Sequence, residues 1–279
     1  MTSDSALVAA ISFAVGWVAS LLAYRVARSS APASLYRTNV NQRQVPVVLG
    51  FGVLFGTVAG AFALVFAFSV TNRQPAGRVG ASLVLVLVAL MFTAGLFDDR
   101  RGDERARGFR GHLSSASGGA LTGGLVKIVA GGLAGMLAAI PADGLGHKLE
   151  VFLLVPLTAN LFNLLDRAPG RTLKVAFVFL VPLMVLGPAS LAVGMAGLAG
   201  ALVALTAADL GERAMLGDAG ANPIGAVVGL ALAYSLEEPF RMLAVLIIAA
   251  LNLASERVSF SRVIDSTRWL RALDGIGRK

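Results

Sequence analysis

Three polar motifs interrupt an otherwise apolar chain, and the first is a pair of carboxylates. Asp98 and Asp99 follow the apolar run from Leu83 to Phe97 and precede Arg100 and Arg101. Adjacent residues of a helix point about 100° apart, so one carboxylate can face a metal ion while its neighbour faces a different group. Two interpretations stay open for this motif alone: a cation site, or a solvated helix end that the two arginines neutralise.

The second motif is a stripe of polar side chains at the end of an apolar segment. Asn160, Asn163 and Asp166 recur at every third position and are expected to line one face of a helix. Amides inside an apolar helix are costly unless they have partners. Hydrogen bonding between helices would explain Asn160 alone, whereas a stripe that ends in a carboxylate also favours a binding site.

The third motif is Gly217-Asp218-Ala219-Gly220, which directly precedes another apolar segment. Its small residues let a phosphate or a metal ion approach the backbone closely. Asp218 alone could be a helix cap. Capping does not account for Asp209 and Glu212, which lie in the same predicted loop.

The available residue types favour magnesium and phosphate chemistry. The chain has no cysteine, and His112 is the one histidine expected on the side of the three motifs. Carboxylate oxygens suit a hard cation such as Mg²⁺, with Mn²⁺ as a substitute, better than they suit zinc. Mg²⁺ beside basic residues is typical of sites that bind phosphate groups.

The composition predicts an integral membrane protein with an all-α fold. Hydrophobic residues make up 56% of the 279 residues, charged residues make up 14%, and the mean hydropathy is +0.77. Because so few polar side chains cannot cover a water-soluble protein of this length, lipid is expected to contact most of the surface. We expect one membrane domain over residues 1–279, with a basic cytoplasmic C-terminal segment over residues 255–279.

Apolar stretches of about 20 residues, the length that crosses a bilayer, recur along the chain. They predict a polytopic bundle of about nine transmembrane helices, with a range of eight to ten. The predicted spans are residues 5–24, 46–70, 79–97, 120–140, 149–165, 173–187, 190–207, 220–236 and 240–254. Gly187-Pro188 indicates either a short turn between two spans or a kink in a re-entrant segment.

The basic residues predict the orientation of the bundle. With nine spans, 19 of the 24 lysines and arginines fall on the side of the C-terminus. The positive-inside rule then predicts an outside N-terminus and a cytoplasmic C-terminus. The same rule accounts for the net charge of +8 without nucleic-acid binding. All three polar motifs fall on the predicted cytoplasmic side.

In this order and spacing, the motifs resemble those of the polyprenyl-phosphate N-acetylhexosamine-1-phosphate transferase family. The family includes phospho-MurNAc-pentapeptide translocase and undecaprenyl-phosphate GlcNAc-1-phosphate transferase. The resemblance runs from about Arg37 to Gly229 and rests on Asp98-Asp99, Asn160-x-x-Asn163-x-x-Asp166 and Gly217-Asp218-Ala219-Gly220. Family members transfer a sugar 1-phosphate from a UDP-sugar to a lipid phosphate at the cytoplasmic face and release UMP.

The resemblance implies a Mg²⁺-dependent enzyme of the bacterial plasma (inner) membrane that acts in cell-wall glycan synthesis, such as that of peptidoglycan. Its substrates would be a UDP-sugar and undecaprenyl phosphate or a similar lipid. The implied roles are catalysis by Asp98, Asp99 and Asp166; metal binding by Asp218 and Asp99; nucleotide-sugar binding by Asn160, Asn163, Asp209 and Lys174; and lipid-phosphate binding by Arg37, Asn39, Arg43 and Lys127. For the basic residues, anchoring to anionic membrane lipids is the alternative role.

Two features depart from the family pattern. Arg167 stands where the family commonly has glycine, and residues 255–279 lack the histidines that related enzymes often carry near the sugar. The alternative is therefore a catalytically inactive relative that binds a lipid phosphate or an envelope-synthesis partner. A transporter or channel is disfavoured because the ionisable residues lie at predicted helix ends. Small-residue helix faces are also compatible with a homodimer.

Overall fold

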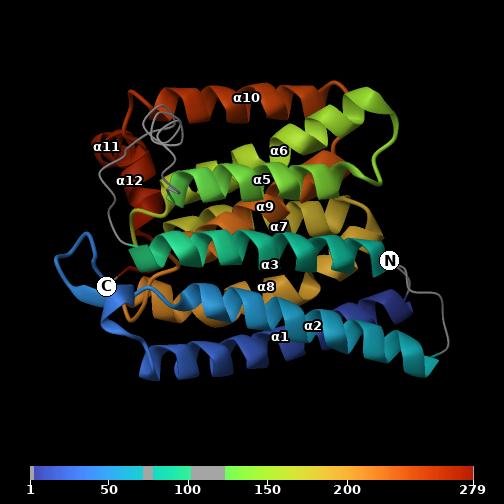
Figure 1. Ribbon diagram of the computed structural model, residues 1–279, viewed down its shortest axis with the longest axis horizontal. Helices are drawn as coiled ribbons and strands as arrows, with labels where there is room; N and C mark the ends of the chain where they lie inside the picture. Colours follow the sequence, from blue (N-terminus) through green and yellow to red (C-terminus); the bar gives the residue numbers. More distant parts are fainter. Residues whose placement is uncertain (1–2, 72–77, 102–122, 279) are drawn as a thin grey trace.

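The computed structural model describes residues 3–71, 78–101 and 123–278, and α-helices dominate these ranges (Figure 1). Successive long helices run in opposite directions along a common axis, and two short helices follow at the C-terminal end. The long helices in these ranges are α1 (Ser3–Ser29), α2 (Leu49–Thr71), α3 (Arg78–Arg101), α5 (Gly123–Ala139), α6 (Gly144–Leu165), α7 (Arg171–Leu186), α8 (Ala189–Leu210), α9 (Asp218–Ser235) and α10 (Phe240–Ser255). The short ones are α11 (Phe260–Ser266) and α12 (Arg268–Gly275).

Each predicted span coincides with one of the long helices, in agreement with the predicted all-α bundle. Within the described ranges, α1, α2, α3, α6 and α8 are long and apolar enough to cross a membrane. A sixth span results if α10 and α11, which meet at 93°, count as one bent unit. The nine-span topology stays a prediction. Gly187 and Pro188 form the short turn between α7 and α8 rather than a kink within one helix.

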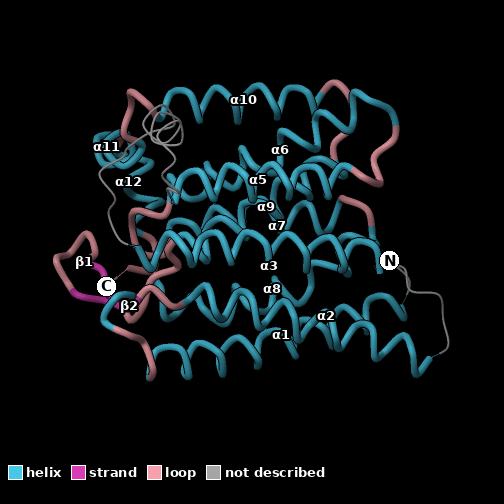
Figure 2. The backbone as a smooth tube through the Cα atoms, in the orientation of Figure 1, coloured by secondary structure: helices cyan, strands magenta, loops and turns pink. Residues whose placement is uncertain are grey.

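A small hairpin departs from the all-α prediction (Figure 2). β1 (Tyr36–Thr38) follows a short 3-10 turn (Ala33–Leu35) and pairs antiparallel with β2 (Gln44–Pro46). The side chain of Asn39 closes the hairpin, because its Oδ1 accepts hydrogen bonds from the backbone N–H groups of residues 41 and 43. The predicted span at 46–70 therefore began too early, and α2 begins at residue 49.

The interior of the bundle is formed by α8 and α9. The central helix α9 contacts α2, α3, α6, α7 and α10, while α8 contacts α1, α2, α3 and α7. Small residues bring these helices close: a Cβ atom added to Gly60 of α2 would lie 2.5 Å from the Cα atom of Gly197 in α8. The outer helices expose large apolar side chains such as Phe66 and Leu253. An apolar outer surface over a close-packed interior is typical of a protein embedded in lipid.

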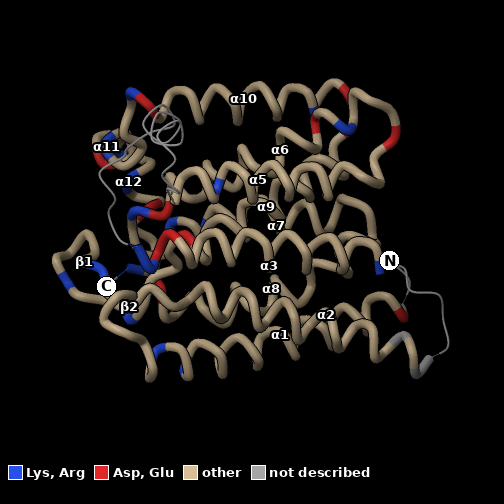
Figure 3. Tube along the Cα trace, in the orientation of Figure 1, with Lys and Arg blue, Asp and Glu red and all other residues tan. Residues whose placement is uncertain are grey.

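Charged side chains gather at the ends of the helices, with a dense group at the end that carries β1, β2, α11 and α12 (Figure 3). The C-terminal ends of α3, α6 and α8 and the N-terminal ends of α5, α7 and α9 also lie at this end (Figure 1). The alternation of helix direction therefore brings the three polar motifs, far apart in sequence, to one end of the bundle.

Candidate functional site

A lysine joins the first and third motifs. The ammonium group of Lys127, one turn into α5, lies 2.5 Å from Oδ2 of Asp98 at the end of α3 and also forms an ion pair with Oδ2 of Asp218 at the start of α9. Both carboxylates contact the same nitrogen atom. The three side chains are each about one-quarter exposed. The group is therefore partly exposed to solvent.

Asp99 has a different role from its neighbour. Its two carboxylate oxygens accept hydrogen bonds from the backbone N–H groups of Asp218, at 3.1 Å, and Ala219, at 2.9 Å. A carboxylate at this position satisfies unpaired N–H groups of the first turn of α9 and interacts favourably with the helix dipole. Asp99 thus fixes the turn that carries Asp218. The two members of the pair point to different partners, as their adjacency in a helix predicts.

Glycine permits the close approach of α3 to this turn. A Cβ atom on Gly95 would overlap the backbone carbonyl group of Asp218, and Gly217 has a left-handed backbone, with φ of 61°. On Gly217, a Cβ atom would also meet Val47 and the carboxylate of Asp99. The small residues of the third motif therefore serve the packing of the turn onto α3 and the hairpin.

The donor set of Asp98 and Asp218 fits a hard divalent cation. Among the described residues, no group of three or more carboxylates and imidazoles is arranged to hold a metal ion. Mg²⁺ in phosphate sites is usually held by one or two carboxylates together with water and substrate phosphates. Two carboxylates that already share one cation, Lys127, match this requirement.

The polar stripe of α6 does not face one partner. Asn160 donates a hydrogen bond to Asn252 of α10, at 2.6 Å, whereas Asn163 donates to Asn222 of α9, at 3.1 Å. Positions three apart differ by about 60° around a helix, and α6 lies between α9 and α10. The structure therefore brings Asn163 toward the turn of Asp218 and directs Asn160 away from it.

The last member of the stripe, Asp166, caps the C-terminal end of α6. Its Oδ1 accepts a hydrogen bond from the hydroxyl group of Thr172, at 3.0 Å. Burial of the carboxyl group raises the pKa of Asp166 well above its usual range, and the negative charge of Asp209 raises it further. Asp209, itself buried, accepts a hydrogen bond from the backbone N–H of Gly170 at 3.0 Å. A shallow depression is lined by these two aspartates together with Glu212, Asn39, Arg167 and neighbouring residues.

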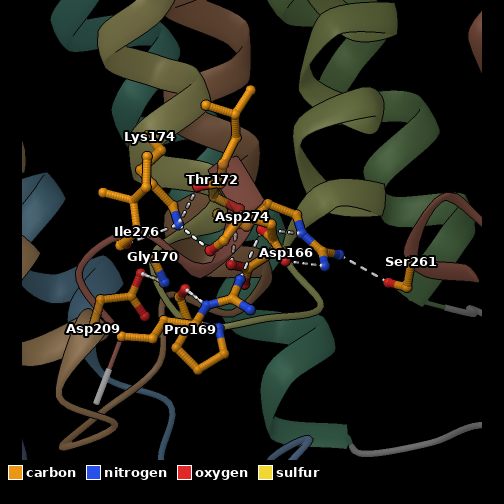
Figure 4. Close-up of polar contacts among 12 residues, drawn as sticks. Asp166, Pro169, Gly170, Thr172, Lys174, Asp209, Ser261, Asp274 and Ile276 are labelled. Atoms are coloured by element: carbon orange, nitrogen blue, oxygen red, sulfur yellow. Dashed lines mark hydrogen bonds and ion pairs between the residues drawn. The ribbon is translucent and has the colours of Figure 1, made fainter. Parts of the chain in front are cut away.

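The C-terminal segment is clamped onto the turn that follows Asp166 (Figure 4). Arg171 donates to both oxygens of Asp274, at 2.9 and 2.7 Å, and to the hydroxyl group of Ser261. Arg278 pairs with the same carboxylate and donates to the carbonyl oxygen of Pro169. Lys174, predicted to bind the nucleotide-sugar, donates to the carbonyl oxygens of residues 273, 274 and 276. We call these contacts of Arg171, Lys174, Asp274 and Arg278 the C-terminal clamp.

The predicted lipid-phosphate residues of the hairpin region have protein partners. Arg37 donates to the backbone carbonyl oxygen of Asp99 and therefore lies beside the carboxylate pair. Asn39 donates to Glu212 at 2.6 Å, which ties the hairpin to the loop between α8 and α9. Arg43 lies 3.9 Å from the same carboxylate and is largely exposed. Of the three, Arg37 is the one whose hydrogen bonds reach the end of α3 that carries the carboxylate pair.

Several polar residues at this end were missed by reasoning from the sequence. Asp274 and Arg278 lie in the basic C-terminal segment, and no regular spacing in the sequence connects them with their partners in the structure, such as Arg171 for Asp274. Asn222 could have been found, because it lies one helical turn after Asp218 in an apolar segment. His112 lies outside the described residues.

No protein-family model matches the chain, and no curated protein matches it. The case for a function therefore rests on the side chains at the polar end of the bundle.

Proposed function

We propose that the protein transfers a sugar 1-phosphate from a UDP-sugar to undecaprenyl phosphate or a similar polyprenyl phosphate, in cell-envelope glycan synthesis. The polar end of the bundle would face the cytoplasm of a bacterial plasma membrane. The gathering of lysine and arginine at this end supports that orientation through the positive-inside rule (Figure 3).

One observation carries the proposal: Asp98, Asp218 and Lys127 meet at the end of an apolar bundle although they come from three different helices. This end is where the phosphate of a membrane-embedded lipid and a water-soluble nucleotide would encounter each other. Carboxylates that can hold a divalent cation, beside a lysine that can contact phosphate oxygens, are the groups that phosphoryl transfer between two anions requires.

In the proposed reaction, an oxygen of the lipid phosphate attacks the phosphorus atom bonded to the sugar. The new bond creates a pyrophosphate-linked lipid, and the bond to the bridging oxygen of UMP breaks, so UMP leaves. Mg²⁺ held by Asp98 and Asp218 would supply charge screening between the two phosphates.

The side chains then divide the remaining tasks. Lys127 and Arg37 would bind phosphate oxygens, while Asp99 would hold the turn of Asp218 in place through its backbone hydrogen bonds. Asp98, whose carboxylate has no such backbone role, would take a proton from the lipid phosphate. That proton transfer is secondary, because a phosphate monoester is already mostly ionised near pH 7.

A second candidate is a non-catalytic protein that binds a lipid phosphate. It is supported by the pairing of Asp98 and Asp218 with Lys127, which neutralises part of the carboxylate charge without any metal. Such a protein would bind polyprenyl phosphate but release no UMP.

The test is UMP release by the purified protein in detergent with Mg²⁺, undecaprenyl phosphate and a panel of UDP-sugars. We expect lipid-dependent release with at least one donor, and a loss of about 100-fold or more in Asp98→Asn and Asp218→Asn. Asp143→Asn is the matched control, since this exposed residue precedes α6 at the opposite end and caps no helix through its side chain. A folded protein that binds the lipid but releases no UMP across the panel would favour the second candidate.

A further inference from the structure

The carboxylates that would bind a metal ion already hold a cation of the protein's own. Lys127 forms ion pairs with both Asp98 and Asp218, so its ammonium group contacts Oδ2 of each. Both oxygens of the neighbouring Asp99 already accept hydrogen bonds, from the backbone N–H groups of residues 218 and 219. A metal ion bound by the same Oδ2 atoms of Asp98 and Asp218 would therefore compete with the ammonium group.

We infer that Lys127 is a displaceable counter-ion that makes metal binding and phosphate binding depend on each other. This inference rests on the proposed function and concerns the order in which that site is filled. Without a phosphate, the ammonium group stays paired with both carboxylates and competes with a divalent cation. When a phosphate enters, it offers the ammonium group a new anionic partner and leaves the carboxylates to the metal.

The surroundings of Lys127 allow this exchange. The lysine side chain is unbranched and flexible, and its partners are about one-quarter exposed, so the ammonium group can move without leaving a polar environment. The start of α5 also lies close to the site, since a Cβ atom on Gly123, one turn before Lys127, would meet the carboxylate of Asp98.

Linkage makes the effect reciprocal: if the phosphate strengthens metal binding, the metal strengthens phosphate binding by the same factor. Coupling free energies between two binding sites commonly correspond to about 5-fold to 150-fold changes in affinity. Removing the positive charge of Lys127 should therefore strengthen binding of the metal alone, whereas loss of a group that only contacts substrate would leave it unchanged.

The experiment measures Mn²⁺ affinity of the full-length protein in detergent by electron paramagnetic resonance, with and without geranyl phosphate as the probe. We expect Lys127→Met to bind Mn²⁺ roughly 5-fold to 150-fold more tightly than the wild type when no phosphate is present. Geranyl phosphate should strengthen Mn²⁺ binding to the wild type by more than it does for the variant. Lys127→Arg, which keeps the charge, should behave as the wild type does.

Lys148→Met is the matched control, since this exposed lysine near the start of α6 lies at the opposite end of the bundle. Thermal unfolding checks that each variant is folded, and Lys127→Gln replaces Lys127→Met if the latter is not. Unchanged or weaker Mn²⁺ binding upon loss of the Lys127 charge would overturn the inference, as would unaltered Mn²⁺ binding in the double variant Asp98→Asn, Asp218→Asn. The Mn²⁺ measurement uses no UDP-sugar, so it holds even if the protein releases no UMP. If the protein is a functional transferase but loss of the Lys127 charge does not strengthen Mn²⁺ binding, this inference alone is overturned.

Discussion

Replacing Asp274 with asparagine removes the carboxylate at the centre of the C-terminal clamp. In the wild type, Arg171 binds both oxygens of Asp274, and the two side chains are only 5% and 7% exposed. The variant leaves the buried guanidinium group of Arg171 without a counter-ion and weakens the contact of Arg278. We therefore expect the segment that contains α11 and α12 to detach from α7 long before the bundle itself unfolds.

The size of the effect follows from the burial of the pair. Removing one partner of a buried ion pair typically costs about 3–5 kcal/mol, because the remaining charge is left unpaired. Each 1.4 kcal/mol is about a factor of ten in an equilibrium constant, so docking of the segment should weaken by roughly two to three and a half orders of magnitude. Replacing both partners by apolar residues, in Arg171→Met with Asp274→Leu, should recover much of this loss.

Hydrogen–deuterium exchange followed by mass spectrometry measures the effect directly, peptide by peptide. Exchange over residues 260–278 should accelerate in Asp274→Asn, while peptides of α8 and α9 keep the protection of the wild type. Asp265→Asn is the matched control, because Asp265 lies on the exposed surface of α11 in the same segment. Equal exchange in Asp274→Asn and the wild type, or an equal acceleration in the control, would refute the clamp.

Three other perturbations test separate parts of the structure. Burial acts to raise the pKa of Asp274, but the hydrogen bond and charge of Arg171 and the charge of Arg278 lower it below its usual value. The free energy that holds the C-terminal segment on the bundle should therefore be constant above about pH 4 and fall below it. The fluorescence of Trp269 in a Trp17→Phe background measures this attachment, and its weakening between pH 5 and pH 8 would contradict the prediction. Burial raises the pKa of Asp166, so the contribution of this carboxyl group to stability is lost as the pH rises. Asp166→Asn, which keeps an acceptor for Thr172, should raise the midpoint of thermal unfolding at pH 8 but not at pH 4. A rise at pH 4 and none at pH 8 would be inconsistent with a buried carboxyl group. Gly95→Ala should destabilise the protein by about 1–3 kcal/mol in thermal unfolding, because the new Cβ atom overlaps the turn of Asp218. Gly132→Ala, whose Cβ atom meets open space, should be neutral or stabilising. Equal effects of the two substitutions would count against close packing at Gly95.

The helical architecture was predictable because it depends on a simple physical demand. Apolar runs must pair their own backbone groups in lipid, so each run forms a helix, and polar residues or Gly-Pro pairs mark where it ends. The hairpin between α1 and α2 escaped prediction because its short strands lie among polar loop residues. Its stability comes from contacts distant in sequence, such as the hydrogen bond from Asn39 to Glu212.

The candidate site was only partly predictable. The alternation of helix direction was enough to predict that Asp98, Asp99 and Asp218 share one end of the bundle. The position of Lys127 between two of these carboxylates could not be predicted, because it depends on how α5 packs beside α3 and on which rotamer the lysine adopts. Lys174 was assigned from its position in the sequence, whereas its partners come from residues about 100 positions later.

The most direct measurement of the central proposal is the identity of the lipid product. Purified protein is incubated with undecaprenyl phosphate, Mg²⁺ and the UDP-sugar that gives UMP release, and the lipid is analysed by mass spectrometry. The proposal predicts a lipid that is heavier by one sugar 1-phosphate, formed in equal amount to UMP and absent in Asp218→Asn. An unmodified lipid in the presence of folded, lipid-binding protein would contradict it.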